Sequence, residues 1–199
     1  MSKIGIFGGS FNPIHIGHIA LARQLLTATG LDEVWFVVSP LNPLKRDAFL
    51  LDDAKRLEMA RLALQDEPRL TVSDIEFHLP RPSYMLHTLQ ALTHAYPQHR
   101  FFLLVGGDNW AAFDRWFGYR EILAHYPVVV YPRGGYPVTA NNLPPNVTLA
   151  DTPLMDISST QIRQNVRDGR SIHDMVPANI EALVVKNYQE TAGAGETHR

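Results

Sequence analysis

The sequence contains no cysteine, and this absence removes several kinds of chemistry at once. A chain without thiols forms no disulfide bond, no thiolate metal site and no cysteine nucleophile. Long apolar runs are absent too, since no stretch reaches the roughly 18 apolar residues that cross a membrane. The first apolar run is also too short for the core of a secretory signal. We therefore expect a cytoplasmic protein that does not span a membrane.

An excess of charge of either sign is also missing. The chain has 18 basic and 20 acidic residues, which gives a formal net charge of −2. So small a charge provides no long-range field to attract nucleic acid, and any polyanion must be held by a local site. Most of the basic residues are arginine, whose planar guanidinium suits forked hydrogen bonds to phosphate or carboxylate. We expect no nucleic-acid partner.

The length of 199 residues and the hydrophobic content of 45% suit one domain with a substantial core. We expect this domain to occupy residues 1–190. The last segment, residues 191–199, is small and polar, and we expect it to be a disordered tail. The chain could also form a homo-oligomer, and its sequence leaves this open.

Short apolar runs alternate along the chain with segments of helical periodicity. The expected strands are residues 3–7, 33–38, 70–75, 100–105, 128–131 and 147–150. The expected helices are residues 16–29, 53–64, 84–96, 159–167 and 178–188. Such alternation, with strands that are apolar almost throughout, is typical of an α/β domain whose mostly parallel sheet has helices on both faces. Ligands then bind beyond the carboxyl ends of the strands.

The segment after the first strand, residues 8–18, reads GGSFNPIHIGH. It leads into the first turn of a helix, where unpaired N–H groups and the positive end of the dipole favour phosphate. His15 and His18 are three residues apart, so both imidazoles reach the same side of that turn. Gly17 between them leaves room for a ligand to approach the backbone. This pattern predicts an anion site with two histidine donors.

Two other uses of this segment fit poorly. Zinc would need a third ligand, but no Glu follows His15 and the chain has no cysteine. The glycines at 5, 8 and 9 do not form the G-x-G-x-x-G pattern of dinucleotide-binding dehydrogenases. Histidines that only pack in the interior remain the simple alternative.

A second polar segment, DISSTQIR at residues 156–163, places hydroxyl groups at a helix start and Arg163 one turn later. An ordinary N-cap explains the hydroxyls by itself. The same donors could also hold phosphate, with the guanidinium supplying a fork for its oxygens. The two interpretations are compatible.

These two segments carry a resemblance to a known family. Residues 10–18 resemble the T/S-x-x-P-x-H-x-G-H signature of the nucleotidylyltransferase superfamily, and residues 157–163 resemble the I-S-S-T-x-x-R motif of nicotinate mononucleotide adenylyltransferases. Residues 43–45, 82–89 and 106–116 also resemble motifs of that family, so the likeness spans about residues 3–167. It differs at Leu44, where the family usually has His, and at Met85, where it usually has Thr.

The resemblance implies a Rossmann-like nucleotidyltransferase in NAD biosynthesis. Such an enzyme transfers AMP from ATP to nicotinate mononucleotide and forms nicotinic acid adenine dinucleotide (deamido-NAD) and pyrophosphate. The resemblance implies catalytic roles for His15, His18 and Arg163. It implies ATP contacts from Gly8, Gly9, Ser10, Phe11, Lys45, Gly106, Asp108, Ile157, Ser158, Ser159 and Thr160. It implies mononucleotide contacts from Ser83, Tyr84, Met85, Trp116 and Arg133. Mg²⁺ is expected to arrive with the ATP phosphates and to need no dedicated protein site.

Alternatives remain at the level of the protein and of single residues. A sister adenylyltransferase would use nicotinamide mononucleotide or phosphopantetheine as acceptor. A non-catalytic nucleotide-sensing module would be expected to lose one of the residues that hold phosphate. Among single residues, Trp116 could belong to the core, Asp108 to a turn, and Lys45 to a solvated loop.

Overall fold

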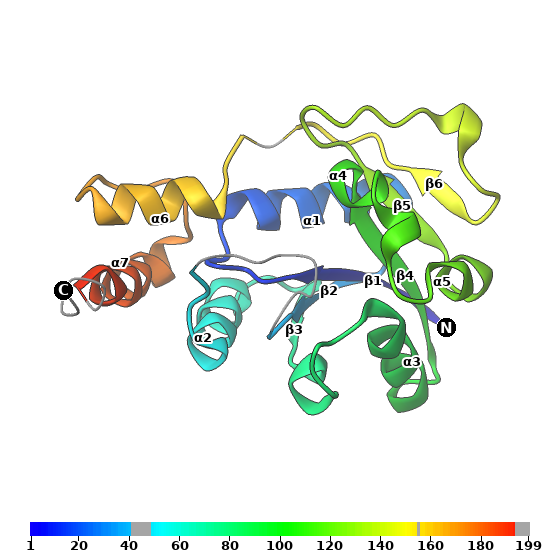
Figure 1. Ribbon diagram of the computed structural model, residues 1–199, viewed down its shortest axis with the longest axis horizontal. Coiled ribbons are helices and arrows are strands. Elements are labelled where there is room, and N and C mark those ends of the chain that lie inside the picture. Colours follow the sequence, from blue (N-terminus) through cyan, green and yellow to red (C-terminus); the bar gives the residue numbers. More distant parts are fainter. Residues whose placement is uncertain (41–48, 155, 194–199) are drawn as a thin grey trace.

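The computed structural model describes residues 1–40, 49–154 and 156–193. Six parallel strands form one sheet in the order β3-β2-β1-β4-β5-β6 (Figure 1). The strands are β1 (Ser2–Gly9), β2 (Glu33–Val38), β3 (Leu70–Ser73), β4 (His99–Gly106), β5 (Val128–Tyr131) and β6 (Val147–Leu149). The expected α/β architecture with a parallel sheet is confirmed.

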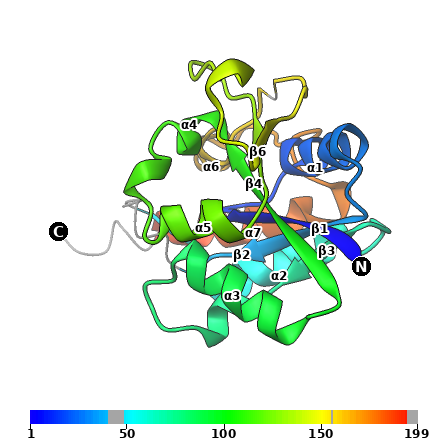
Figure 2. The same ribbon diagram turned by 90° about the vertical axis from the view of Figure 1, so that its right-hand side faces the viewer.

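Helices connect the strands. The α-helices are α1 (Ile16–Thr29), α2 (Asp53–Leu64), α3 (Met85–Ala95), α4 (Gly107–Trp110), α5 (Tyr119–His125), α6 (Ser159–Arg167) and α7 (Ala178–Gly193). Short 3-10 helices are η1 (Ile75–His78), η2 (Phe113–Arg115) and η3 (Ala140–Asn142). In Figure 1, α1 lies above the sheet and α3 below it, and Figure 2 shows the same two helices on opposite sides.

Side chains of the strands belong alternately to two hydrophobic cores, because successive residues of a strand point to opposite faces of the sheet. One core joins a sheet face to α1, α2, α6 and α7, and its strand members include Phe7, Val34, Phe36, Leu104 and Val129. The other joins the opposite face to α3 and α5, and its strand members include Ile4, Ile6, Trp35, Leu103 and Val105. Burial on both faces explains why these strands are apolar almost throughout.

The strand order changes direction at β1. This strand pairs with β2 on one side and with β4 on the other. The chain therefore builds the sheet outward in one direction first, and later in the other. In open parallel sheets, ligands bind beyond the carboxyl ends of the strands at such a switch point. The residues that end β1, β2 and β4 consequently border one crevice.

The helices that the sequence did not predict are short. Both α4 and α5 contain too few apolar positions to display a helical period, and both begin beside glycine. The third strand ends at Ser73, earlier than expected, because η1 starts at Ile75. At the other end of the chain, α7 continues to Gly193, into the expected tail. The rest of that tail, residues 194–199, lies outside the described residues.

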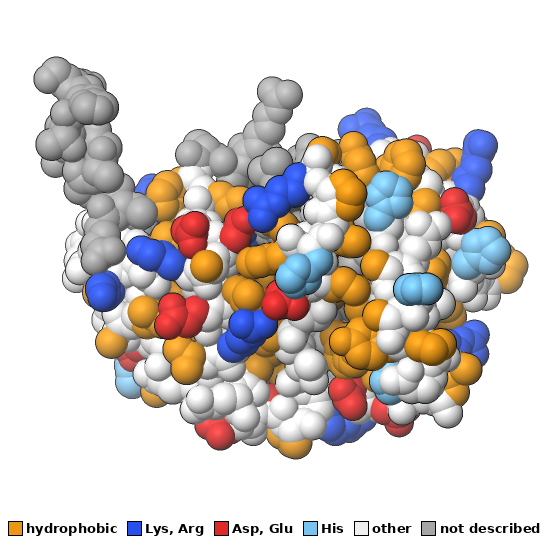
Figure 3. Space-filling view, turned by 90° about the horizontal axis from the view of Figure 1, so that it is seen from below, with side chains coloured by type: hydrophobic (Ala, Val, Ile, Leu, Met, Phe, Trp, Pro, Cys, Tyr) orange, Lys and Arg blue, Asp and Glu red, His pale blue; other side chains and the backbone are white. Residues whose placement is uncertain are grey.

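The surface of the described residues has a mixed character. Figure 3 shows hydrophobic side chains interspersed with charged and histidine side chains over the face seen from below. Within the described part of the chain, no helix combines the length and apolarity that a membrane crossing requires.

Two glycines offer a matched test of the packing below the sheet. Gly118 has a φ of 67°, and a Cβ there would lie 2.3 Å from Cδ2 of the buried Leu86. Gly30 has a φ of 63° and open space around it. We expect Gly30→Ala to lower the free energy of unfolding by about 1 kcal/mol, the cost of the backbone conformation alone. Gly118→Ala should cost about 2–4 kcal/mol because the methyl group also overpacks Leu86. Denaturant unfolding of both variants measures this difference, and equal losses would contradict the packing argument.

Candidate active site

The loop between β1 and α1 is anchored on both sides. The carbonyl oxygen of Gly9 accepts a hydrogen bond from the N–H of Ser39, which follows β2, at 2.9 Å. Further along the loop, the amide of Asn12 donates to the carbonyl of Phe49 at 2.9 Å and accepts from the N–H of Leu51 at 3.2 Å. Asn12 is buried, so these bonds replace the water that its amide would otherwise bind. The loop conformation is therefore fixed by residues distant in sequence.

His15 and His18 stack on each other at the end of this loop. Their ring centroids are 3.6 Å apart and the planes differ by 27°. The backbone N–H of His15 donates to Nδ1 of His18 at 3.2 Å. In a neutral ring this bond leaves the proton on Nε2, because Nδ1 acts as the acceptor. The expected pairing of the two imidazoles on one side of the turn is confirmed.

Gly17 serves the His15 ring directly. A Cβ at this position would lie 2.9 Å from Nδ1 of His15 and 3.5 Å from Cβ of Ile157. From its position between the two histidines, this glycine is expected to leave room for a ligand. In the structure it also makes room for the imidazole and for the residue before α6.

Burial changes the proton affinity of His15. Burial, and to a smaller extent the positive charge of Arg133, together lower the pKa of this imidazole from 6.5 to about 4. Only 4% of His15 is exposed to solvent. At neutral pH the ring is therefore neutral in the protein without a bound anion.

The start of α6 lies against the loop after β1, although about 150 residues separate the two in sequence. The hydroxyl of Ser159 donates to the carbonyl of Pro13 at 2.8 Å. Nη1 of Arg163 donates to the carbonyl of Asn12 at 2.8 Å, and Nη2 contacts the hydroxyl of Thr160 at 3.3 Å. The two expected phosphate segments thus come together in space.

Ser158 is the N-cap of α6, and its hydroxyl accepts a hydrogen bond from the N–H of Gln161 at 3.2 Å. The capping role considered from the sequence is therefore present. It does not conflict with phosphate binding, because a capped N-terminus still presents other N–H groups at its end.

The carboxyl end of β4 places Asp108 beside Arg133, with 3.7 Å between Oδ1 and Nε. Gly106 permits this approach, because a Cβ there would lie 2.6 Å from Oδ1 of Asp108 and 3.1 Å from Cγ of Arg133. The resemblance assigned Arg133 to the mononucleotide and Asp108 to ATP. The structure pairs the two, and Arg133 lies close enough to His15 for its charge to affect the pKa of that imidazole.

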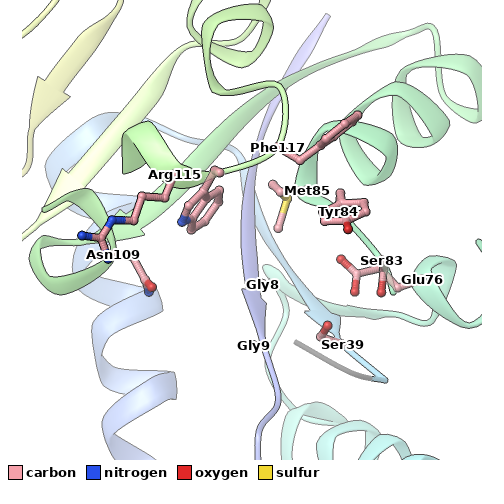
Figure 4. A pocket seen from close by; sticks show the side chains of 11 residues that line it. Gly8, Gly9, Ser39, Glu76, Ser83, Tyr84, Met85, Asn109, Arg115 and Phe117 are labelled. Atoms are coloured by element: carbon pink, nitrogen blue, oxygen red, sulfur yellow. The ribbon is translucent and has the colours of Figure 1, made fainter. Parts of the chain in front are cut away.

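A pocket of about 490 Å³ opens next to the glycines at the end of β1. It is lined by Gly8, Gly9, Ser39, Glu76, Ser83, Tyr84, Met85, Asn109, Arg115, Trp116 and Phe117. Figure 4 shows Asn109 and Arg115 on one side and Ser83, Tyr84 and Glu76 on the other, with Met85 projecting between them. This volume suits a small aromatic ligand with attached polar groups.

The pocket brings together four of the five residues expected to contact the mononucleotide. These are Ser83, Tyr84, Met85 and Trp116. Arg133 is not among its lining residues. Lys45, expected to contact ATP, lies outside the described residues, as does Leu44.

Five lining residues were not singled out from the sequence: Ser39, Glu76, Asn109, Arg115 and Phe117. Asn109 follows Asp108, and Arg115 and Phe117 flank Trp116, so their position beside expected site residues could have suggested them. Ser39 directly follows a strand, which is the expected place for a ligand contact. Glu76 gave no local signal, because its position in the pocket depends on the packing of η1 against α3.

Glu76 is buried and makes an incomplete set of contacts within the described residues. Oε1 accepts a hydrogen bond from the hydroxyl of Thr88 at 2.8 Å, whereas Oε2 has no partner. The hydroxyl of Ser83 and Nε1 of Trp116 are likewise buried without a partner. Because buried polar atoms are rarely left unpaired, these groups mark places where a ligand or water completes the bonding.

Comparison with known proteins identifies the family. Residues 6–165 match the model of the cytidylyltransferase-like family. A probable nicotinate-nucleotide adenylyltransferase of Bacteroides fragilis is 53% identical over 197 residues, covering 99% of this chain and 96% of the relative. The chain belongs to the nicotinate-nucleotide adenylyltransferase family. A probable nicotinate-nucleotide adenylyltransferase of Cytophaga hutchinsonii is 44% identical, and the match covers 92% of this chain and 95% of the relative.

Solved structures agree on the fold. The nicotinic acid mononucleotide adenylyltransferase of Plasmodium falciparum, complexed with NaAD, superposes with a TM-score of 0.77 over 97% of both chains, at 19% identity. A putative nicotinate-nucleotide adenylyltransferase from Vibrio parahaemolyticus gives a TM-score of 0.70 at 21% identity, over 93% of this chain and 99% of its own. The family resemblance inferred from the motifs is confirmed, and so is the Rossmann-like fold.

The lowered pKa of His15 predicts how stability depends on pH. In the unfolded chain this imidazole binds a proton near pH 6.5, but in the folded, ligand-free protein only near pH 4. Its contribution to stability is therefore complete above pH 6.5 and is lost as the pH falls toward 4. The loss amounts to about 3 kcal/mol.

Denaturant unfolding of the native protein and of His15→Gln between pH 8 and 4 measures this effect. We expect the stability of the native protein to fall more steeply than that of the variant between pH 6.5 and 4. Parallel curves would show that His15 is not buried as a neutral group.

Proposed function

We propose that this protein transfers the adenylyl group of ATP to nicotinate mononucleotide. The products are nicotinic acid adenine dinucleotide and pyrophosphate. The support comes from the family to which the chain belongs and from the pocket beside the loop after β1.

One observation carries the proposal. The hydrogen bonds of Ser159 and Arg163 to the loop after β1 bring a helix start, a guanidinium and two imidazoles to one place. This concentration of donors beside a parallel-sheet switch point suits a triphosphate. The adjoining pocket then suits the pyridine nucleotide. A phosphate site beside an aromatic-lined pocket is the arrangement that joining two nucleotides requires.

The reaction needs positioning more than proton transfer. A phosphate oxygen of the mononucleotide attacks the α-phosphorus of ATP, and the bond from that phosphorus to the oxygen bridging to the β-phosphorus breaks. The attacking phosphate is already ionised at neutral pH, so no general base is needed. The protein must hold the two phosphates in line and stabilise the charge that develops.

The imidazoles supply donors for this charge. Nδ1 of His18 accepts a bond from the backbone of His15, so Nε2 of His18 carries the proton. This N–H can donate a hydrogen bond to an oxygen of the α-phosphate. His15 is neutral without ligand, and a bound anion would raise its pKa and favour its charged form. Arg163, Ser158, Ser159 and Thr160 are assigned to the departing pyrophosphate, together with Lys45.

The pyridine ring is assigned to the pocket. Trp116 lines it and can stack on the ring. Tyr84 is the N-cap of α3 and Met85 its first residue, so the N–H groups of that helix start border the same space. Such donors suit the carboxylate of nicotinate.

We assign Mg²⁺ to the phosphates of ATP, where it would neutralise charge. Its ligands would be phosphate oxygens and water. Among the described residues, no three carboxylate or imidazole groups converge to hold a metal, so the assignment makes no use of a protein cage.

One observation favours a second acceptor, nicotinamide mononucleotide. The unpaired Oε2 of Glu76 lies in the pocket that would hold the ring. A carboxamide could give its N–H₂ to this oxygen and accept a bond from the start of α3, whereas a carboxylate would meet a like charge. Direct comparison of the two mononucleotides therefore tests the proposal.

We expect His18→Ala to lower kcat by more than about 100-fold while folding remains intact, since loss of one preorganised donor costs 10²–10³ in rate. Pyrophosphate release at saturating substrates measures this. His125→Ala, an exposed histidine on α5, is the matched control and should retain native turnover. Near-native turnover of folded His18→Ala would remove His18 from the reaction.

We expect the native protein to prefer nicotinate over nicotinamide mononucleotide, because both oxygens of a carboxylate can accept bonds from helix-start N–H groups whereas an amide offers only one oxygen. The loss is about 1–3 kcal/mol.

If backbone groups decide this preference, Met85→Thr should change kcat/KM for the acid only modestly. Assays of both mononucleotides with both proteins measure this. Preference of the native protein for the amide would instead support Glu76 as the deciding group, and a preference reversed by Met85→Thr would assign specificity to that side chain.

A further inference from the structure

Phe11, in the loop after β1, has a strained backbone. Its φ is 44°, in the left-handed region that bulky residues rarely adopt. Such a conformation is unfavourable and persists only where the surrounding structure determines it. The side chain is buried, and its ring packs 5.3 Å from that of Phe36 and 5.1 Å from that of His18. The strain therefore lies in the segment assigned to ATP.

A buried arginine holds the residue that precedes Phe11. Arg56, on α2, is fully buried, and its guanidinium binds five groups from separate parts of the chain. They are the carbonyl oxygens of Leu51, Ser10, Ser39 and Pro40, and the carboxylate of Asp53. The loops that follow β1 and β2 are thereby joined through one side chain. An arginine is suited to this because its donors form a fixed, planar fork.

A tyrosine from the last helix holds the residue that follows Phe11. The hydroxyl of Tyr188, on α7, donates to Oδ1 of Asn12 at 2.7 Å. The carbonyl of the same Asn12 accepts from Arg163 at 2.8 Å. Asn12 follows Phe11 directly, so the strained residue lies between two anchored neighbours.

The hydrogen bond to Arg56 also fixes a peptide plane. The peptide between Ser10 and Phe11 is trans, so its carbonyl and N–H point in opposite directions. Because Arg56 draws the carbonyl of Ser10 toward itself, the N–H of Phe11 is turned away from the guanidinium. Loss of this bond would free the peptide to rotate.

We propose that Arg56 and Tyr188 are positioning residues, which hold the residues directly before and after Phe11 in the conformation that binds ATP. This rests on the proposed function of the loop. Neither residue lines the pocket, so neither is expected to touch the mononucleotide. Their removal should therefore weaken ATP more than the acceptor.

Tyr188→Phe is the mildest test, because it removes one hydroxyl and keeps the ring in the core. The net worth of one hydrogen bond predicts an increase of about 3- to 10-fold in the dissociation constant of ATP. The dissociation constant of nicotinate mononucleotide should change less than 2-fold. Tyr126→Phe is the control, since the Tyr126 hydroxyl contacts Thr93 at 3.3 Å on the far side of the sheet core and should affect neither ligand.

Arg56→Lys tests the contact with the residue before Phe11. Lysine keeps the charge but cannot reach the carbonyls of both loops, so we expect weakening of ATP by about 10-fold or more. Arg61→Gln, on the same helix, removes an exposed ion pair with Asp74 and should leave ATP affinity unchanged. If Arg56→Lys does not fold, Tyr188→Phe still decides the proposal.

Calorimetric titration with ATP and with the mononucleotide, together with thermal unfolding, separates the outcomes. A selective loss of ATP affinity supports the proposal. Lower thermal stability with an unchanged ratio of the two dissociation constants would overturn it, because the residues would then only support the fold. If the native protein binds no ATP, the proposed function fails and this proposal fails with it. Should the native protein and Tyr188→Phe bind ATP equally, only the positioning role is lost.

Discussion

The parallel pairing of β1 with β2 on one side and β4 on the other is the constraint on which the rest of the structure depends. It places the ends of three strands at one edge and requires the connections to leave that edge in opposite directions. The loop after β1 must cross this gap, and its backbone cannot be paired within the sheet. Arg56 on α2, and Ser159 and Arg163 on α6, supply hydrogen-bond donors for its carbonyl groups. The site is thus a consequence of satisfying the backbone at a topological break.

A buried site for anions faces a conflict between ligand binding and folding. Permanently charged donors at its centre would have to be desolvated without a partner, which is costly. Here the central donor, His15, is neutral without ligand because burial lowers its pKa to about 4, with Arg133 adding to the effect. Positive charge is instead placed at the margin, on Arg133 and Arg163, which keep contact with other groups. A triphosphate would then bring the negative charge that favours protonation of His15.

The sequence was sufficient to predict what depends on local pattern. Buried strands, long helices and the His15/His18 pair follow from periodicity and spacing, and the structure contains them. What it could not predict depends on long-range packing. Nothing near Glu76 indicates a pocket, and nothing near Arg56 distinguishes it from a solvated arginine on a helix. Short helices such as α4 were not predicted, because four residues are too few to display a helical period of hydrophobicity.

The two halves of the site are also connected through Asp53 on α2. Asp53 accepts a hydrogen bond from Arg56 at 2.6 Å and forms an ion pair with Arg81 at 3.0 Å. Arg56 holds the loop assigned to ATP, whereas Arg81 precedes the Pro82-Ser83-Tyr84 segment that borders the pocket. An exposed ion pair alone contributes little, but Asp53 also compensates the charge of a fully buried guanidinium. The carboxylate that makes burial of Arg56 tolerable is therefore the same one that contacts Arg81 next to the acceptor side. Both substrate loops are therefore linked to one carboxylate on α2, and displacing the loop assigned to ATP would uncover the charge of Arg56 that the fold has buried.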